Sequence, residues 1–263
     1  NPQLVMMSTC MRGQTGPHRS YGGFGNQGAA LAGLFSITGW PDRAPVGPWG
    51  AYTDFIAPRF GVAAIMAALR HRQMTGAGQY IDLSQIEAGI QFMGPLVSAA
   101  DELLVQNPGM DSLYLCPHGV YTAQDDVSYL AVAVESDAQW WNLAKVVGLG
   151  DEAAGWDFQQ RVKNRGEIDR AIEHWVGNRR AQAGETELLA NNVPAHQVLW
   201  PTQLYEDAQL RHRDFFLALD HPEIGTAHYD GHVTKFSATP PMLSTAAPTL
   251  GQHSDEIRKR FAN

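Results

Sequence analysis

The sequence is poor in the features that mark secreted, membrane-spanning or nucleic-acid-binding proteins. Only two cysteines occur among 263 residues, Cys10 and Cys116, and they stand in no metal-binding spacing, which predicts a reducing, cytoplasmic setting. No apolar run approaches the roughly 20 residues that cross a bilayer, so no membrane partner is expected. The formal net charge is −8 and no basic stripe is present, which argues against a nucleic-acid partner.

Metal-ligand patterns are also missing. The ten histidines are scattered, and none forms an i, i+4 pair with a nearby carboxylate in the manner of zinc enzymes. We therefore predict no metal site. The remaining composition, 44% apolar and 17% charged, is typical of a soluble globular protein whose length allows one large domain or two smaller ones.

The first part of the chain, residues 1–108, alternates strand and helix patterns. The opening segment PQLVMMST predicts a buried strand that leads into a turn-rich loop, and GAALAGLFSITG predicts a helix that Gly39 stops. A longer helix is expected from Phe55 to about Met74, followed by the strand YIDLS and a further helix over IEAGIQFMGPLVSAADELL. This order favours an α/β layer with a covered, parallel sheet.

The pattern changes beyond Pro108. A half-buried hairpin is expected around QDD, followed by amphipathic helices, the first of them capped by Asp137. These features predict a smaller α+β domain over residues 109–200. The last segment, 201–263, is expected to be an extended, Pro-rich return to the large domain that ends in a short helix capped by Ser254.

Asp54, in GAYTDFIAPRF, is the most informative carboxylate. Aspartate is among the best helix-capping residues, and Pro58 would then lie in the first turn, where its missing N–H costs nothing. The same position suits a nucleophile, because the open N–H groups of a helix start hold a carboxylate ionised and oriented. Spacing alone does not decide between a cap and a catalytic group.

Two other polar side chains are candidates for a site. Gln14, in RGQTGP, could donate an amide N–H to a reacting carbonyl, or could be a solvated turn residue. His118, in CPHGVY, could act as a base, although its turn position favours a histidine satisfied by the backbone. The adjacent Asp125 and Asp126 point in different directions along a strand, so the exposed tip of the hairpin is the simpler interpretation.

Several segments together resemble the family III CoA-transferases, which include the formyl-CoA:oxalate and carnitine enzymes. These are STCMRGQTGP, GGFGNQGAALAGLFSITGWPDRAPVGP and YTDFIAPRFGVAAIMAALRHRQMTGAGQYIDLSQIEAGI, followed in the family's order by NVPAHQVLWPTQLYEDAQLRHRDFF and APTLGQHSDEI. The resemblance covers nearly the whole chain and is strongest over residues 13–92. Linked motifs over such a span are more specific than one short pattern.

The resemblance implies that Asp54 is the nucleophile of an acyl-CoA:carboxylate CoA-transferase. It would attack an acyl-CoA thioester to form a mixed anhydride, and the released CoA would convert this to an aspartyl-CoA thioester. Tyr52, Gln14 and His118 are the expected substrate-binding neighbours. Acyl-CoA and a carboxylic acid are then substrates, and no permanently bound cofactor is expected.

The resemblance also implies an architecture. The fold class becomes α/β, with part of a Rossmann-like large domain and a smaller α+β domain in an interlocked dimer. Family members carry an N-terminal half before the region matched here, and this chain opens on NPQLVMMSTC without an initiator methionine or a signal peptide. We therefore expect that half to be a separate chain, cleaved off, or absent from this sequence. The expected assembly is an interlocked homodimer or a complex with a partner chain that supplies the half.

Some positions depart from the family pattern and keep alternatives open. The related α-methylacyl-CoA racemases pair the aspartate with a histidine where this chain has Phe24, which weakens a racemase interpretation. The family's usual GFD ends here in Gly25, and a usual small residue is replaced by Met11. Either change could retune the acyl pocket or mark a non-catalytic partner subunit.

Overall fold

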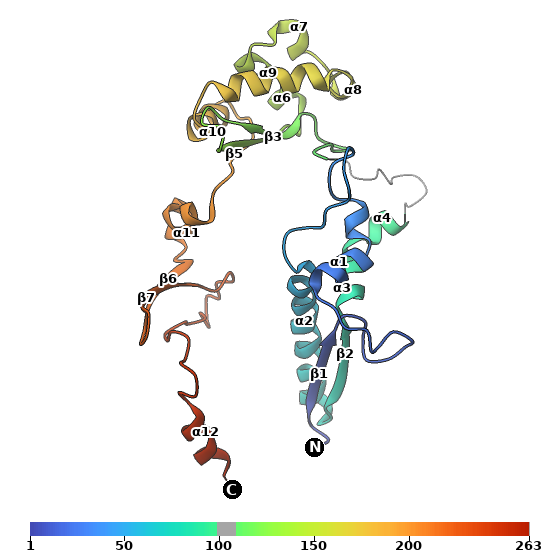
Figure 1. The fold of residues 1–263 in the computed structure, drawn as a ribbon, viewed down its shortest axis with the longest axis vertical. Coiled ribbons are helices and arrows are strands. Elements are labelled where there is room, and N and C mark those ends of the chain that lie inside the picture. Colours follow the sequence, from blue (N-terminus) through green and yellow to red (C-terminus); the bar gives the residue numbers. More distant parts are fainter. Residues whose placement is uncertain (99–108, 263) are drawn as a thin grey trace. The chain divides into compact units, whose positions relative to one another are not determined.

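The computed structural model describes residues 1–98 and 109–262, and the chain divides into two compact units, Asn1–His196 and Gln197–Asn263 (Figure 1). The first unit opens with the elements β1 (Val5–Cys10), α1 (Gly25–Leu31), the 3-10 helix η1 (Leu34–Ser36), α2 (Tyr52–Thr75), β2 (Gln79–Ser84), α3 (Gln85–Phe92) and α4 (Gly94–Ser98). Beyond residue 108 follow β3 (His118–Thr122), β4 (Tyr129–Ala133), α6 (Asp137–Val147), α7 (Gly150–Ala154), α8 (Phe158–Lys163), α9 (Arg165–Gly177), α10 (Ala181–Ala190) and β5 (Ala195–Gln197).

Strands β1 and β2 form a parallel pair with α2 as part of the crossover between them. Their register runs from Val5 opposite Gln79 to Cys10 opposite Ser84. Helix α2 ends at Thr75 and is capped by Gly76, whose φ of 75° favours a residue without a side chain. The Gly78 N–H then donates to the Pro2 carbonyl at 2.8 Å. The end of α2 therefore lies beside the beginnings of the strands, and its start lies at their carboxyl ends.

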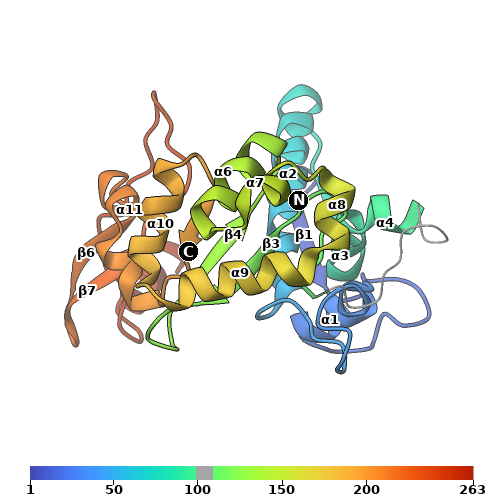
Figure 2. The same cartoon turned by 90° about the horizontal axis from the view of Figure 1, so that it is seen from above.

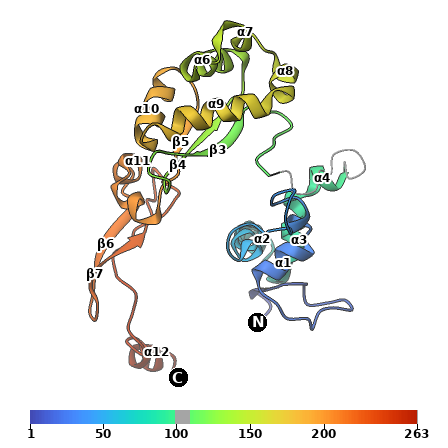
Figure 3. The same ribbon diagram turned by 45° about the horizontal axis from the view of Figure 1, so that its top comes forward.

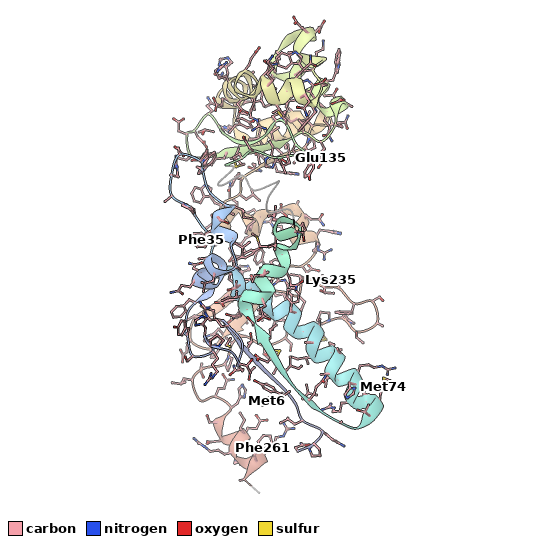
Figure 4. The ribbon with its side chains drawn as sticks, turned by 90° about the vertical axis from the view of Figure 1, so that its right-hand side faces the viewer. Met6, Phe35, Met74, Glu135, Lys235 and Phe261 are labelled. Carbon is pink, nitrogen blue, oxygen red and sulfur yellow. The ribbon has the colours of Figure 1, made fainter. Side chains whose placement is uncertain are left out.

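Helix α2 covers one face of the β1–β2 pair. Gly61 faces Met7 and Leu83, since a Cβ placed on it would lie 3.2 Å from the Met7 Cε and 3.4 Å from the Leu83 Cδ2. On the other face, Met6 and Tyr80 are register partners and are 52% and 54% exposed. The expectation that the first strand is buried was therefore wrong, because only its α2 face is covered by described residues. Figure 4 shows Met6 on β1, with Phe35 and Met74 toward opposite ends of α2.

Short helices pack at the start of α2. The expected helix over GAALAGLFSITG ends earlier than Gly39, because Gly33 has a φ of 89° and the chain continues as η1. Small residues of α1 and α3 pack against α2 near its start (Figure 3). One small apolar cluster is built on Ala29, Ala32, Leu34 and Met93, and another on Ile56, Ala57 and Ala88.

A three-stranded sheet in the order β3–β4–β5 organises residues 116–197. Strands β3 and β4 form the expected antiparallel hairpin, and α9 and α10 pack on them (Figure 2). The core of this part is built on buried apolar side chains, including Leu130, Trp140 and Ile172. Asp137 does not cap α6: Ser136 accepts the Gln139 N–H there, while the Asp137 carboxylate pairs with the buried Arg161 at 2.7 Å.

The second unit contains η2 (Pro201–Glu206), α11 (Ala208–His212), β6 (Phe216–His221), β7 (Gly225–Asp230) and α12 (Ser254–Phe261). The antiparallel hairpin of β6 and β7 was not anticipated in a segment expected to be extended. Helix α12 does begin at Ser254, but its N-cap is His253 and no side chain caps it.

The structure is mixed α/β, as expected. The proposed boundary at residue 108 lies outside the described residues, so the division into 1–108, 109–200 and 201–263 stays a prediction. None of the described helices is both long enough and apolar enough to span a bilayer.

Candidate functional site

The candidate site lies at the carboxyl edge of the β1–β2 pair. In open α/β sheets this edge is where loops collect and ligands bind. The loop after β1 is tied to the end of β2 and to the start of α3, because the Met11 carbonyl accepts the Ser84 hydroxyl at 3.2 Å and the Ile86 N–H at 3.0 Å. The start of α2 lies at the same edge, since Ile56 and Ala57 cluster with Leu83 and Ala88.

Gln14 stands on a turn that β2 holds in place. Its backbone N–H donates to both carboxylate oxygens of Asp82, at 3.0 and 2.9 Å. Gly13 precedes it with a φ of 80°, a conformation that a residue with a side chain rarely adopts. The Gln14 side-chain amide contacts the Cys10 sulfur at 3.6 Å and is exposed. The turn is therefore fixed, while the amide remains accessible.

Asp82 is a residue that the sequence reasoning missed. The available signal was an acidic residue inside the apolar strand YIDLS. The Asp82 carboxylate, instead of water, accepts the hydrogen bond of the Gln14 N–H. Asp82 therefore holds the loop after β1 in one defined position.

Asp54 lies in the first turn of α2 but does not cap it. The N-cap position is Ala51, whose carbonyl accepts the Asp54 N–H at 2.9 Å. The Asp54 side chain is partly exposed and has no hydrogen-bond or ion-pair partner among the residues that the structure describes. The capping interpretation was therefore wrong, and the carboxylate is left available near the positive end of a 24-residue helix.

Pro58 also differs from expectation. Because α2 begins at Tyr52, Pro58 lies inside the helix instead of in its first turn. Proline has no N–H, so it cannot donate to the carbonyl four residues before it, which is that of Asp54. The helix therefore lacks one backbone hydrogen bond at the candidate nucleophile.

The other predicted site residues have different surroundings. Tyr52 is partly buried and packs against the clusters of Ala29 and of Ile56. The His118 Nδ1–H donates to the Met110 carbonyl at 2.8 Å, which is the backbone-satisfied arrangement that its turn position favours. Within the described ranges, no hydrogen bond joins His118 to Gln14, Tyr52 or Asp54.

Met11 and Gly25, the residues that depart from the family pattern, fit closely against their neighbours. Met11 is buried over Gly23, where an added Cβ would lie 1.9 Å from the Met11 Cε. A Cβ on Gly25 would lie 2.6–2.7 Å from Ala51, including its backbone atoms. Met11 and Gly25 are therefore tightly packed, whereas Phe24, which directly precedes Gly25, is 78% exposed.

The arrangement offers a carboxylate nucleophile and, on the neighbouring loop, an amide that can donate a hydrogen bond. Across residues 1–98 and 109–262, no three His, Cys, Asp or Glu side chains gather as a metal site would require. An accessible carboxylate of this kind is a group that can attack a carbonyl carbon.

The family comparison and the similar proteins of known name all point to CoA-transferases. The sequence matches CoA-transferase family III over residues 1–254. It is 28% identical to a succinyl-CoA–D-citramalate CoA-transferase of Chloroflexus aurantiacus over 98% of this chain and 65% of that protein. It is also 28% identical to the beta subunit of a succinyl-CoA–L-malate CoA-transferase of the same organism, over 99% of this chain and 66% of that subunit.

A solved structure shows the same fold. The crystal structure of a CAIB/BAIF family protein from Brucella suis superposes with a TM-score of 0.87 at 24% identity, covering 99% of this chain and 68% of that one. The chain thus spans 65% and 66% of the length of the two transferases named above, slightly less than two thirds.

Proposed function

Since this chain belongs to the family III CoA-transferases, we propose that the protein moves coenzyme A from an acyl-CoA to a carboxylic acid, with Asp54 as nucleophile. The observation that carries this proposal is the Asp54 carboxylate at the start of α2, which has no partner among the described side chains. The resemblance of YTDFIAPRF to the family's sequence, which implies that Asp54 is the nucleophile, supports it.

The first half of the reaction loads CoA onto the enzyme. An Asp54 oxygen attacks the thioester carbonyl carbon, the C–S bond breaks, and CoA leaves as a thiolate with the bonding electron pair. The product is a mixed anhydride of Asp54 and the acyl group. The thiolate then attacks the Asp54 Cγ, which releases the donor carboxylate and leaves an aspartyl-CoA thioester.

The second half reverses these steps with the acceptor. The acceptor carboxylate attacks the Asp54 Cγ and displaces the CoA thiolate, and the thiolate then attacks the acceptor's acyl carbon, which frees the Asp54 carboxylate. Charge develops on an Asp54 oxygen each time Cγ is attacked, and the positive end of α2 favours negative charge there. Gln14 is the proposed amide donor to the reacting acyl group, with Tyr52 beside the nucleophile; His118 stays a substrate-binding proposal.

The names of the relatives suggest a donor substrate and an assembly for this protein. Two relatives named above use succinyl-CoA with a hydroxylated dicarboxylic acid, so succinyl-CoA is the first donor to try. The proposed assembly is an interlocked homodimer or a pair with a partner chain that supplies the family's N-terminal half; one relative is named as a beta subunit. The free cysteines, Cys10 and Cys116, suit the cytoplasm.

The racemase alternative lacks its second base. Phe24 stands where that histidine would be, and a phenyl ring cannot accept a proton. The remaining alternative, a non-catalytic subunit, is tested by the same experiment as the transferase.

The experiment is denaturing intact-mass and peptide analysis of natively purified protein after succinyl-CoA and a hydroxylamine quench. Hydroxylamine converts an aspartyl anhydride or thioester to a hydroxamate, which we expect at Asp54. Asp54→Asn should abolish the adduct and CoA transfer, whereas Asp42→Asn, an exposed carboxylate on a loop of the same unit, should retain both. With a donor that supports turnover, full activity of Asp54→Asn would refute the mechanism and favour a non-catalytic role.

A further inference from the structure

Thr53, the residue before Asp54, is completely buried although it carries a hydroxyl. Its exposed fraction is 0%, and its Oγ1 donates to the Gly25 carbonyl at 3.1 Å. Thr53 is the second residue of α2, so this helix has no carbonyl four residues earlier to accept the hydroxyl, as happens for threonines deeper in a helix. Here the hydroxyl instead ties the first turn of α2 to the first residue of α1, 28 positions away in sequence.

Glycines of two helices make room for this contact. A Cβ on Gly28 of α1 would lie 2.4 Å from the Thr53 Oγ1, and one on Gly89 of α3 would lie 3.3 Å from its Cγ2. A side chain on Gly28 would therefore displace the hydroxyl. The two branches of Thr53 thus occupy a socket, defined by Gly25, Gly28 and Gly89, that is shaped for this residue.

We infer that Thr53 is a positioning residue for the Asp54 carboxylate, an inference that rests on the proposed function. Asp54 itself has no partner among the described side chains that could orient it. Its direction is therefore set by the backbone of the first turn of α2, and Thr53 adds to the apolar packing of this turn a buried hydrogen bond to α1. A small displacement of a nucleophile is costly, since a misplacement of about 1 Å can reduce a rate about 100-fold.

The chain offers matched variants for a test. Thr53→Val keeps the branched shape but removes the donor, whereas Thr53→Ser keeps the donor. Gly28→Ala places a methyl group of α1 against the Thr53 hydroxyl and so disturbs the socket without changing Thr53. Gly22→Ala is its control, because a Cβ at Gly22 would meet nothing within 4 Å. Each variant is compared with natively purified wild-type protein by thermal melting, by kcat and KM for the acyl-CoA, and by the rate of hydroxamate formation at Asp54.

We expect Thr53→Val to lower kcat and the rate of adduct formation about 10- to 100-fold, with KM changed less than about threefold. Thr53→Ser should restore most of the rate. If Thr53 had a purely structural role, Thr53→Val would lower the melting temperature, but the folded fraction of the variant would not show a fall in kcat at nearly unchanged KM. Wild-type rates in folded Thr53→Val would overturn the inference.

Gly28→Ala keeps the test decisive if Thr53→Val does not fold. We expect it to lower kcat in the same way while Gly22→Ala does not, and equal kcat in the two glycine variants would overturn the inference. If the wild-type protein forms no adduct at Asp54, the proposed function fails and this inference fails with it. An adduct in wild type that forms equally fast in Thr53→Val refutes the positioning role alone.

Discussion

The backbone N–H of Gln14 donates to both carboxylate oxygens of Asp82, which lies 68 positions later in the sequence. Gln14 follows β1, and Asp82 lies within β2, two residues before its end. One strand therefore holds the loop of the other, and the position of the Gln14 amide depends on the parallel pairing of the two.

Asp82→Asn should weaken this tie. An asparagine keeps one acceptor oxygen but turns an NH₂ group toward the loop, and hydrogen bonds to a charged acceptor contribute about 1.5–3 kcal/mol where they are sheltered. Because Asp82 is exposed, we expect a loss of about 1 kcal/mol in the free energy of unfolding and roughly a tenfold lower kcat/KM.

Chemical denaturation and steady-state kinetics measure both effects. Glu87→Gln, in the first turn of α3, is the control, because it removes a nearby negative charge without touching the Gln14 N–H. Unchanged kcat/KM in Asp82→Asn would show that the position of the loop does not matter for transfer.

Gly25→Asp introduces the acidic residue that the family usually has at this position. We do not expect this change to raise the rate of CoA transfer. A Cβ at this position would lie 2.7 Å from backbone atoms of Ala51, directly before the first turn of α2. We expect overpacking to lower the free energy of unfolding by about 1–3 kcal/mol and to reduce CoA transfer. Thermal melting and a transfer assay test this, with Gly22→Asp as the control at an open glycine. Higher activity in Gly25→Asp would mean that the acidic position had simply been lost.

Tyr121→Phe should change the pH dependence of stability. Burial of the phenol, reinforced by the Asp169 carboxylate to which it donates at 2.8 Å, raises the pKa of Tyr121 well above its ordinary value near 10. Above about pH 10 the unfolded state releases this proton and the folded state keeps it. The wild-type protein should therefore lose up to about 1.4 kcal/mol of unfolding free energy per pH unit from this group, while the variant does not.

Urea unfolding at several pH values from 8 to 11 would measure that difference. Burial also raises the pKa of the Cys116 thiol, but this group is present in both proteins and cancels in the comparison. At neutral pH the variant should lose about 1 kcal/mol, from the missing hydrogen bond to Asp169. CoA transfer should be unaffected, and parallel pH profiles would refute the assignment to Tyr121.

Local patterns were enough to predict several elements. The long helix α2 followed from apolar spacing and from the Gly-rich turn after it, and the structure ends it at Thr75, with Gly76 as its cap. The hairpin of β3 and β4 followed from the turn at Asp125, whose carboxylate accepts the Val127 and Ser128 N–H groups. In each case the residues that decide the structure are neighbours in sequence.

The remaining features depend on residues that are distant in sequence. Nothing near Thr53 indicates that its hydroxyl will bond to Gly25, and nothing near Asp137 indicates that Arg161 will occupy its carboxylate. The expected position of Pro58 was wrong because the helix was expected to start at Phe55, with Asp54 as its cap, whereas it starts at Tyr52. The parts of the site that could be predicted were residue identities, while the contacts that orient them required the fold.

The parallel pairing of β1 with β2 has a consequence for the order in which the protein folds. The two hairpins, β3–β4 and β6–β7, join strands separated by short turns, so each can close rapidly. Strand β1 must wait for the whole of α2 and then β2 before its ladder can form, which carries the larger entropic cost of closing a long loop. During synthesis, β1 therefore gains its partner only after α2 and β2 have emerged, so the edge that carries Gln14 and Asp54 cannot be completed before Ser84 has been made.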